Sequence, residues 1–171
     1  LPKDKPSGES NASAQLIGLP AKEDVTAEAV TPLLEQSGGL AISTEGTLYF
    51  ANHKKSGAIG KYEIGKDKKP ETFIDLNDWI SSSGDRDIRV EGLRIDDEAR
   101  LLIAEAGTGK LLRVSPDARK LEVLADSYDG YRFATVKDLA IGSNGDLYAS
   151  SPYSGTAYRI RPKAGYVGIL N

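Results

Sequence analysis

The stretch GLAISTEGTLYF at residues 39–50 decides the fold, because two similar stretches follow it along the chain. They are GLRIDDEARLLI at residues 92–103 and DLAIGSNGDLYA at residues 138–149. Each stretch is typical of an apolar strand, a turn and a second strand. The copies start 53 and 46 residues apart, close to the roughly 40–50 residues of a β-propeller blade. The repeat therefore predicts an all-β chain built from propeller blades.

Turn signals divide each repeat into four short strands, the number found in a propeller blade. The strands that we expect are 40–42, 48–51, 59–64 and 71–76; 93–95, 101–104, 110–114 and 120–124; and 139–141, 146–149, 156–161 and 166–170. The predicted domain covers residues 21–171, with three four-stranded blades at about 38–76, 91–125 and 137–171.

Three blades are an incomplete propeller, because a closed ring needs about 4–8 of them. Two expectations follow: a homodimer that completes a six-bladed ring, or a second half supplied by a processed or truncated longer chain. Residues 29–34 are predicted to add an outer strand that completes a blade. The alternative for this segment is a helix over residues 22–36, which Pro32 would kink or break.

The composition excludes several classes of protein. A net charge of -3 gives no reason to expect nucleic acid as a partner, and no apolar run approaches the length of a membrane span. Cysteine is absent, which excludes disulfides and thiolate chemistry. Residues 1–20 are polar and are predicted to be a disordered leader. This leader and the missing initiator methionine favour an extracytoplasmic or secreted location.

Three smaller features have structural interpretations. The GTGK stretch at residues 107–110 lacks the first glycine and the final hydroxyl residue of a phosphate loop, so a tight turn is predicted. His53, the only histidine, is expected to be solvated rather than catalytic. Trp79, the only tryptophan, is expected on a short helical turn at the propeller rim or, alternatively, in a ligand platform.

A run of short motifs in the middle of the chain is shared with a known superfamily. The motifs are EGL at 91–93, ARLLIAE at 99–105, RVSPD at 113–117, LADSYDGYRF at 124–133, KDL at 137–139 and SNGDLY at 143–148. Through them the chain resembles the six-bladed β-propellers of the gluconolactonase and regucalcin (senescence-marker protein) superfamily.

The resemblance implies a divalent cation, usually calcium, at the ring centre, where it would polarise a lactone or phosphoester. The ligands would precede the first strand of several blades, at Gly38, Glu91 and Lys137. Glu91 is the candidate ligand, with Asp138 in support. Gly38 has no side chain and Lys137 would repel a cation, so the alternative is a metal-free mouth with a Glu91–Lys137 ion pair.

The resemblance also places the connector before the third repeat beside the central pocket. Tyr131, Arg132 and Phe133, together with Lys137, are the candidate pocket residues. The alternative is that the aromatic residues of this connector, which include Tyr128, only pack against the rim. Two functions remain open: a metal-dependent hydrolase of lactones or related esters, with no catalytic residue assigned, and a non-catalytic binding or assembly module.

Overall fold

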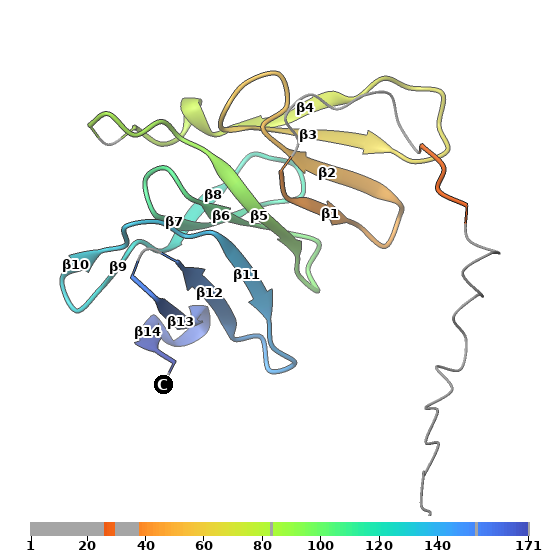
Figure 1. Cartoon of the computed structure of the whole chain (residues 1–171). Coiled ribbons are helices and arrows are strands. Elements are labelled where there is room, and N and C mark those ends of the chain that lie inside the picture. Colours follow the sequence, from red (N-terminus) through yellow and green to blue (C-terminus); the bar gives the residue numbers. More distant parts are fainter. Residues whose placement is uncertain (1–25, 30–37, 83, 153, 171) are drawn as a thin grey trace, which may run out of the picture.

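The computed structural model describes residues 26–29, 38–82, 84–152 and 154–170, which contain three four-stranded antiparallel sheets (Figure 1). The first sheet consists of β1 (Leu40–Ile42), β2 (Thr47–Ala51), β3 (Ala58–Glu63) and β4 (Glu71–Asp75). The second consists of β5 (Val90–Ile95), β6 (Leu101–Glu105), β7 (Lys110–Val114) and β8 (Leu121–Ala125). The third consists of β11 (Asp138–Ile141), β12 (Leu147–Ser151), β13 (Thr156–Arg161) and β14 (Tyr166–Ile169). The prediction of three four-stranded blades is confirmed; we call them blades 1, 2 and 3.

The strand ends lie within two residues of the predicted ones, with one exception. Strand β5 begins at Val90 rather than at Leu93. Its register against β6 shifts between Val90 and Gly92, so Glu91 is the extra residue of a β-bulge. Val90 and Leu93 belong to the same buried cluster although they are three residues apart, so the bulge breaks the alternation from which the strand was predicted, and the predicted strand starts too late.

Two features of the connections were not predicted. A small hairpin of β9 (Ser127–Tyr128) and β10 (Tyr131–Arg132) precedes blade 3. Its turn, Asp129-Gly130, has φ angles of 50° and 79°, as a two-residue hairpin turn requires. A 3₁₀ turn, η3 (Pro162–Ala164), joins the last two strands.

The helical turn predicted at the rim is present. It is η2 (Leu76–Asp78), and the amide of Trp79 donates to the Leu76 carbonyl at 3.0 Å. The predicted leader at residues 1–20 and residues 30–34 of the predicted extra strand lie outside the described residues, and Ala29 has no regular secondary structure. None of the helical segments in the described ranges is long and apolar enough to cross a membrane.

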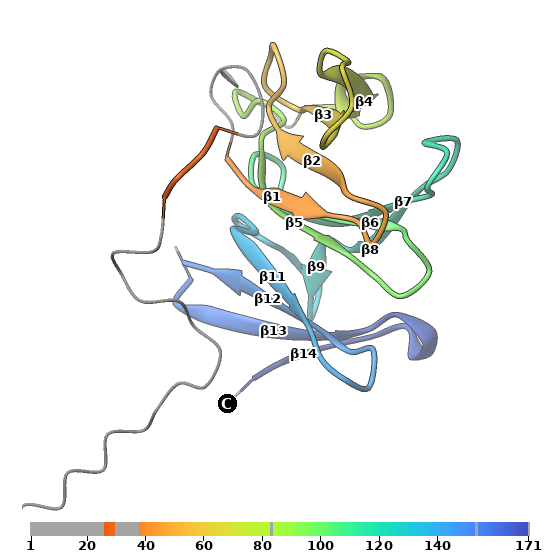
Figure 2. The same ribbon diagram turned by 90° about the vertical axis from the view of Figure 1, so that its right-hand side faces the viewer.

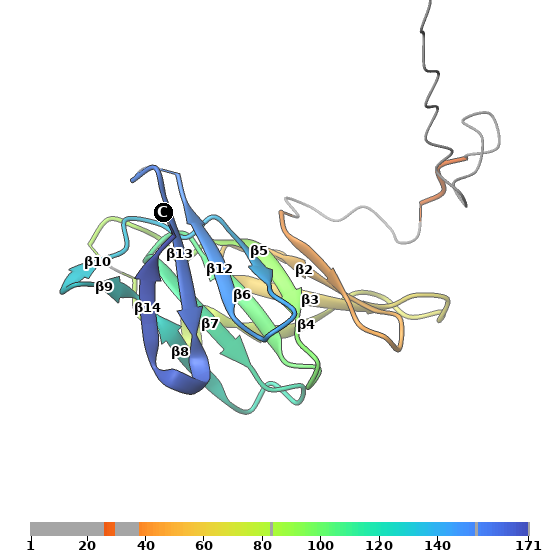
Figure 3. The same cartoon turned by 90° about the horizontal axis from the view of Figure 1, so that it is seen from below.

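The blades stack in chain order, with their first strands side by side (Figure 2). Strand β5 lies between β1 and β11. The β1–β2, β5–β6 and β11–β12 turns lie at one end of the stack, and the β6–β7 turn, the β4–β5 connector and the β9–β10 hairpin lie at the other (Figures 1 and 3). We call the latter the connector end.

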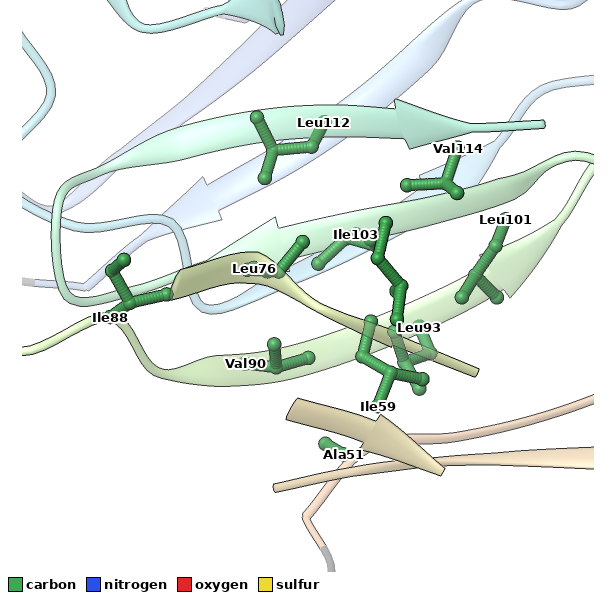
Figure 4. Close-up of a cluster of buried hydrophobic side chains, with 11 residues drawn as sticks. Ala51, Ile59, Leu76, Ile88, Val90, Leu93, Leu101, Ile103, Leu112 and Val114 are labelled. Carbon is green, nitrogen blue, oxygen red and sulfur yellow. The ribbon is translucent and has the colours of Figure 1, made fainter. Parts of the chain in front are cut away.

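Two apolar clusters hold the stack together. The first joins blades 1 and 2, where Ile59 faces Leu93 and Ile103 and all three are fully buried (Figure 4). The second joins blades 2 and 3 and includes Leu111 and Leu139. Burial of apolar surface is the main driving force for such packing, so the two junctions account for most of the fold's stability.

Candidate functional site

The predicted ion pair between Glu91 and Lys137 is present at the connector end. Lys137 Nζ lies 3.4 Å from Glu91 Oε1. Arg89 Nε donates to the same oxygen at 2.9 Å, a contact that the sequence did not predict. Arg89 and Glu91 are two residues apart in the sequence, and their side chains are in contact beside the bulge at Glu91. One carboxylate therefore serves two cations from neighbouring blades.

Asp138 has a separate set of partners. Its carboxylate lies 3.3 Å from Arg94 Nη2 of blade 2 and accepts the Leu139 amide at 2.8 Å. A Cβ on Gly92 would lie only 2.7 Å from Asp138 Oδ1, so a glycine is needed where β5 approaches β11. The structure thus places Asp138 in a bridge between blades 2 and 3.

The residues at the predicted metal position do not fit a calcium ion. Calcium takes about 6–8 oxygen ligands, several of them carboxylates. Glu91 is already paired with Arg89 and Lys137, and Gly38 offers no side chain. Within the described ranges, no group of three or more His, Cys, Asp or Glu side chains could hold a metal.

A cavity of about 560 Å³ opens beside this charged cluster. It lies among the β4–β5 connector, the β6–β7 turn and the segment before β11, and its lining includes Asp85, Arg86, Asp87, Arg89, Gly107 and Thr135. Arg86 Nη1 donates to the Ala134 carbonyl at 2.6 Å, which ties the connector to blade 3. Arg89 connects the cavity to the ion pairs of Glu91.

The fully buried carboxylate of Glu105 organises the cavity wall. Its Oε1 accepts the amides of Arg89 at 2.9 Å and Gly107 at 2.7 Å. Its Oε2 accepts the Thr108 amide at 2.9 Å and the Thr108 hydroxyl. Residues 106–109 form the tight turn predicted for the GTGK stretch. Sequence reasoning missed Glu105, and its only signal is an acidic residue between an apolar strand and a glycine-containing turn.

Some aromatic residues of the connector before blade 3 are packed against the blade, and others are exposed. Phe133 is 2% exposed and packs on Tyr158 with ring centroids 4.4 Å apart, and Tyr128 lies 6.1 Å from the same ring. Phe133 and Tyr128 thus pack against blade 3, as the alternative to a pocket role predicted. Tyr131 and Arg132 are exposed on β10. Their role in a pocket stays a prediction, as does that of Lys137.

His53 differs from expectation. Its ring is half-buried against Phe50, with centroids 5.1 Å apart, so the prediction of a solvated side chain is wrong. Burial, with a smaller contribution from Lys54, lowers the pKa of His53. Its Nε2 atom is buried without a hydrogen-bond partner in the described part of the chain. His53 lies in the β2–β3 loop, and its packing against the ring of Phe50 in β2 explains this environment.

A second cavity, of about 610 Å³, lies between blades 2 and 3 at the opposite end of the stack. Several charged residues of its lining are in ion pairs. Arg100 pairs with Asp96 at 2.7 Å. Arg161 pairs with Asp146 at 3.3 Å. Arg159, which does not line the cavity, pairs with the same carboxylate at 2.6 Å and holds the pKa of Asp146 below its usual range. These ion pairs fit a structural role better than a binding role.

Local sequence matches to known proteins agree with the fold. Over 61 residues the chain is 30% identical to a gluconolactonase of Zymomonas mobilis, and the aligned region covers 36% of this chain and 17% of that protein. Over 81 residues it is 33% identical to strictosidine synthase-like protein 4 of Arabidopsis thaliana, and the aligned region covers 46% of this chain and 20% of that protein. The chain thus spans about a fifth of the length of these relatives. No protein-family model matches it.

The chain also superposes on a gluconolactonase structure from Xanthomonas campestris with a TM-score of 0.63 and 17% identity, over 83% of this chain and 48% of that one. The resemblance to the gluconolactonase-like superfamily of six-bladed β-propellers is confirmed. The three blades of this chain match part of such a propeller, with the Arg89–Glu91–Lys137 cluster at their connector end.

Proposed function

We propose that this chain is a non-catalytic propeller module that binds a small polyhydroxylated carboxylate, such as a sugar acid, in the cavity at the connector end. The observation that carries the proposal is the position of Arg89. Arg89 lines the cavity, and its guanidinium group is held by Glu91, whose carboxylate is thereby committed to an ion pair. The residue that would bind a metal in an enzyme instead orients an arginine.

The chemistry of the lining favours this class of ligand. Arg86 and Arg89 present guanidinium groups, which bind carboxylates with paired hydrogen bonds. Asp85 and Asp87 can accept hydrogen bonds from hydroxyl groups. The volume of about 560 Å³ falls within the usual range for small-molecule sites. A ligand with one carboxylate and several hydroxyls uses both sets of groups.

Isothermal titration calorimetry with D-gluconate tests the binding site, with D-glucose as the uncharged comparison. We expect gluconate to bind more tightly than glucose, and Arg86→Gln to weaken gluconate binding at least tenfold, because charge-assisted hydrogen bonds contribute about 1.5–3 kcal/mol. The matched control is Arg119→Gln, since the Arg119 side chain is 87% exposed in the β7–β8 turn. Equal affinity for gluconate and glucose, or an unchanged affinity in Arg86→Gln, would contradict the proposal.

A second candidate is a calcium-dependent lactonase, which the 30% identity to a gluconolactonase over 61 residues favours. The assay is hydrolysis of glucono-1,5-lactone with added calcium and then with a chelator. From the ion-paired state of Glu91 we expect the rate to match spontaneous hydrolysis under both conditions. A calcium-dependent rate that Glu91→Gln abolishes, while Glu98→Gln does not, would establish the lactonase instead.

A further inference from the structure

We call the face that a blade turns toward the start of the stack its leading face, and the face that it turns toward the end of the stack its trailing face. Where two blades meet, the trailing face of the earlier blade packs against the leading face of the later one. Cross-strand partners lie on the same face of a sheet, so the register assigns residues to faces. In blade 2, Leu93, Ile95 and Leu101 lie on the leading face and contribute to the cluster shared with blade 1.

The leading faces of all three blades carry the same residue types at equivalent positions. They are Leu40, Ile42 and Leu48; Leu93, Ile95 and Leu101; and Leu139, Ile141 and Leu147. The four leucines of blades 2 and 3 are at most 3% exposed. In blade 1, Leu40 is 52% exposed and Ile42 is 59% exposed. On the same face of blade 1, Phe50 is 1% exposed and Leu48 is half-buried, and Ile141 of blade 3 is itself 38% exposed. The part of the leading face of blade 1 that the described residues leave open is therefore apolar and is formed by Leu40 and Ile42.

The trailing face of blade 3 repeats that of blade 1. The equivalent cross-strand sets are Ala41, Tyr49 and Lys61 in blade 1, and Ala140, Tyr148 and Arg159 in blade 3. In blade 1, Ala41 and Tyr49 pack against the cluster that contains the leading face of blade 2. In blade 3, Ala140 is exposed and Tyr148 is half-buried.

We propose that the leading face of blade 1 binds the trailing face of blade 3 in a second copy of this chain. The chain already contains this type of junction once, where Ala41 and Tyr49 of blade 1 pack against the cluster that contains Leu93 and Leu101 of blade 2. The two open faces present the same residue types, with arginine in place of lysine. The complementary surface needed by each copy is therefore present on the other.

Symmetry makes this assembly closed. A twofold axis through the centre of the ring generates two identical junctions, so two copies of three blades form a ring of six. No leading or trailing face remains open in that ring. A junction at a different angle would instead propagate into a filament.

Sedimentation velocity over a range of protein concentrations tests the proposal. The chain is expected to form a dimer of twice its 18.3 kDa mass. Leu40→Asp is expected to raise the dimer dissociation constant at least about 100-fold, because both junctions would then bury a carboxylate without a partner. Val123→Asp is the matched control, because Val123 is 49% exposed on the outer strand of blade 2. Circular dichroism checks that each variant remains folded.

Mixing two variants tests which faces meet. Leu40→Asp disables a leading face and Tyr148→Asp a trailing face, so each variant alone should be monomeric. An equimolar mixture should form a heterodimer, because one of its two junctions joins two unaltered faces. A monomeric wild-type chain, open-ended oligomers, or a Tyr148→Asp variant that still dimerises fully would overturn the proposal.

Discussion

Replacing Glu105 with leucine is expected to lower the free energy of unfolding by about 3–5 kcal/mol, because three backbone amides would lose their acceptor in a buried site. These amides belong to Arg89, Gly107 and Thr108. The carboxylate is fully buried, so water cannot replace it without a rearrangement of the turn. Urea unfolding followed by circular dichroism measures the change.

Comparing Glu105→Gln with Glu105→Leu distinguishes the contribution of the Glu105 hydrogen bonds to stability from that of its side-chain size. Glu105→Gln keeps the size of the side chain and one carbonyl acceptor, so it should retain part of the stability that Glu105→Leu loses. Glu122→Leu is the control for the loss of a carboxylate, since Glu122 is only partly buried and pairs with Arg113 and Lys120 at the edge of blade 2. A loss below about 1 kcal/mol in Glu105→Leu would mean that the amides find other acceptors.

The same substitution is expected to affect the cavity. Glu105 holds the Arg89 amide and the β6–β7 turn together, and both line the cavity. A turn released from this carboxylate no longer fixes the direction of the Arg89 side chain. The buried acid therefore supports the candidate site without contacting a ligand.

The fold could be predicted from the sequence because each blade repeats its apolar pattern. Leu93, Ile95 and Leu101 in one repeat and Leu139, Ile141 and Leu147 in the next are enough to place the strands and their buried faces. The missed hairpin did have a signal, since Asp129-Gly130 is a typical two-residue hairpin turn. The bulge at Glu91 breaks the alternation, since Val90 and Leu93 belong to the same buried cluster although they are three residues apart, but Gly92 has no side chain to mark the break.

The candidate site could be predicted only in part. The Glu91–Lys137 pair followed from the resemblance, which implies a site at the residues that precede the first strands of neighbouring blades. Arg89 and Glu105 could not be found this way. Their contacts depend on the bulge and on hydrogen bonds from a side chain to backbone amides, and neither has a periodic signature in sequence.

The matched substitutions Leu93→Ala and Leu40→Ala are expected to have very different effects, although both remove the same atoms from equivalent strands. Leu93 is 0% exposed between blades 1 and 2, so its truncation should cost about 2–5 kcal/mol through lost burial and a cavity. Leu40 is 52% exposed, so at protein concentrations low enough to keep the chain monomeric its truncation should cost less than about 0.5 kcal/mol. Urea unfolding at two protein concentrations measures both.

The dependence of the Leu40→Ala effect on protein concentration connects this prediction to the proposed ring. In the dimer Leu40 should become buried as Leu93 is, so the cost of Leu40→Ala should rise toward that of Leu93→Ala as concentration increases. The cost of Leu93→Ala should stay large at every concentration, because its junction lies within one chain. Equal and constant costs for the two variants would mean that Leu40 is already buried in the isolated chain, which would contradict both the exposed leading face and the dimer.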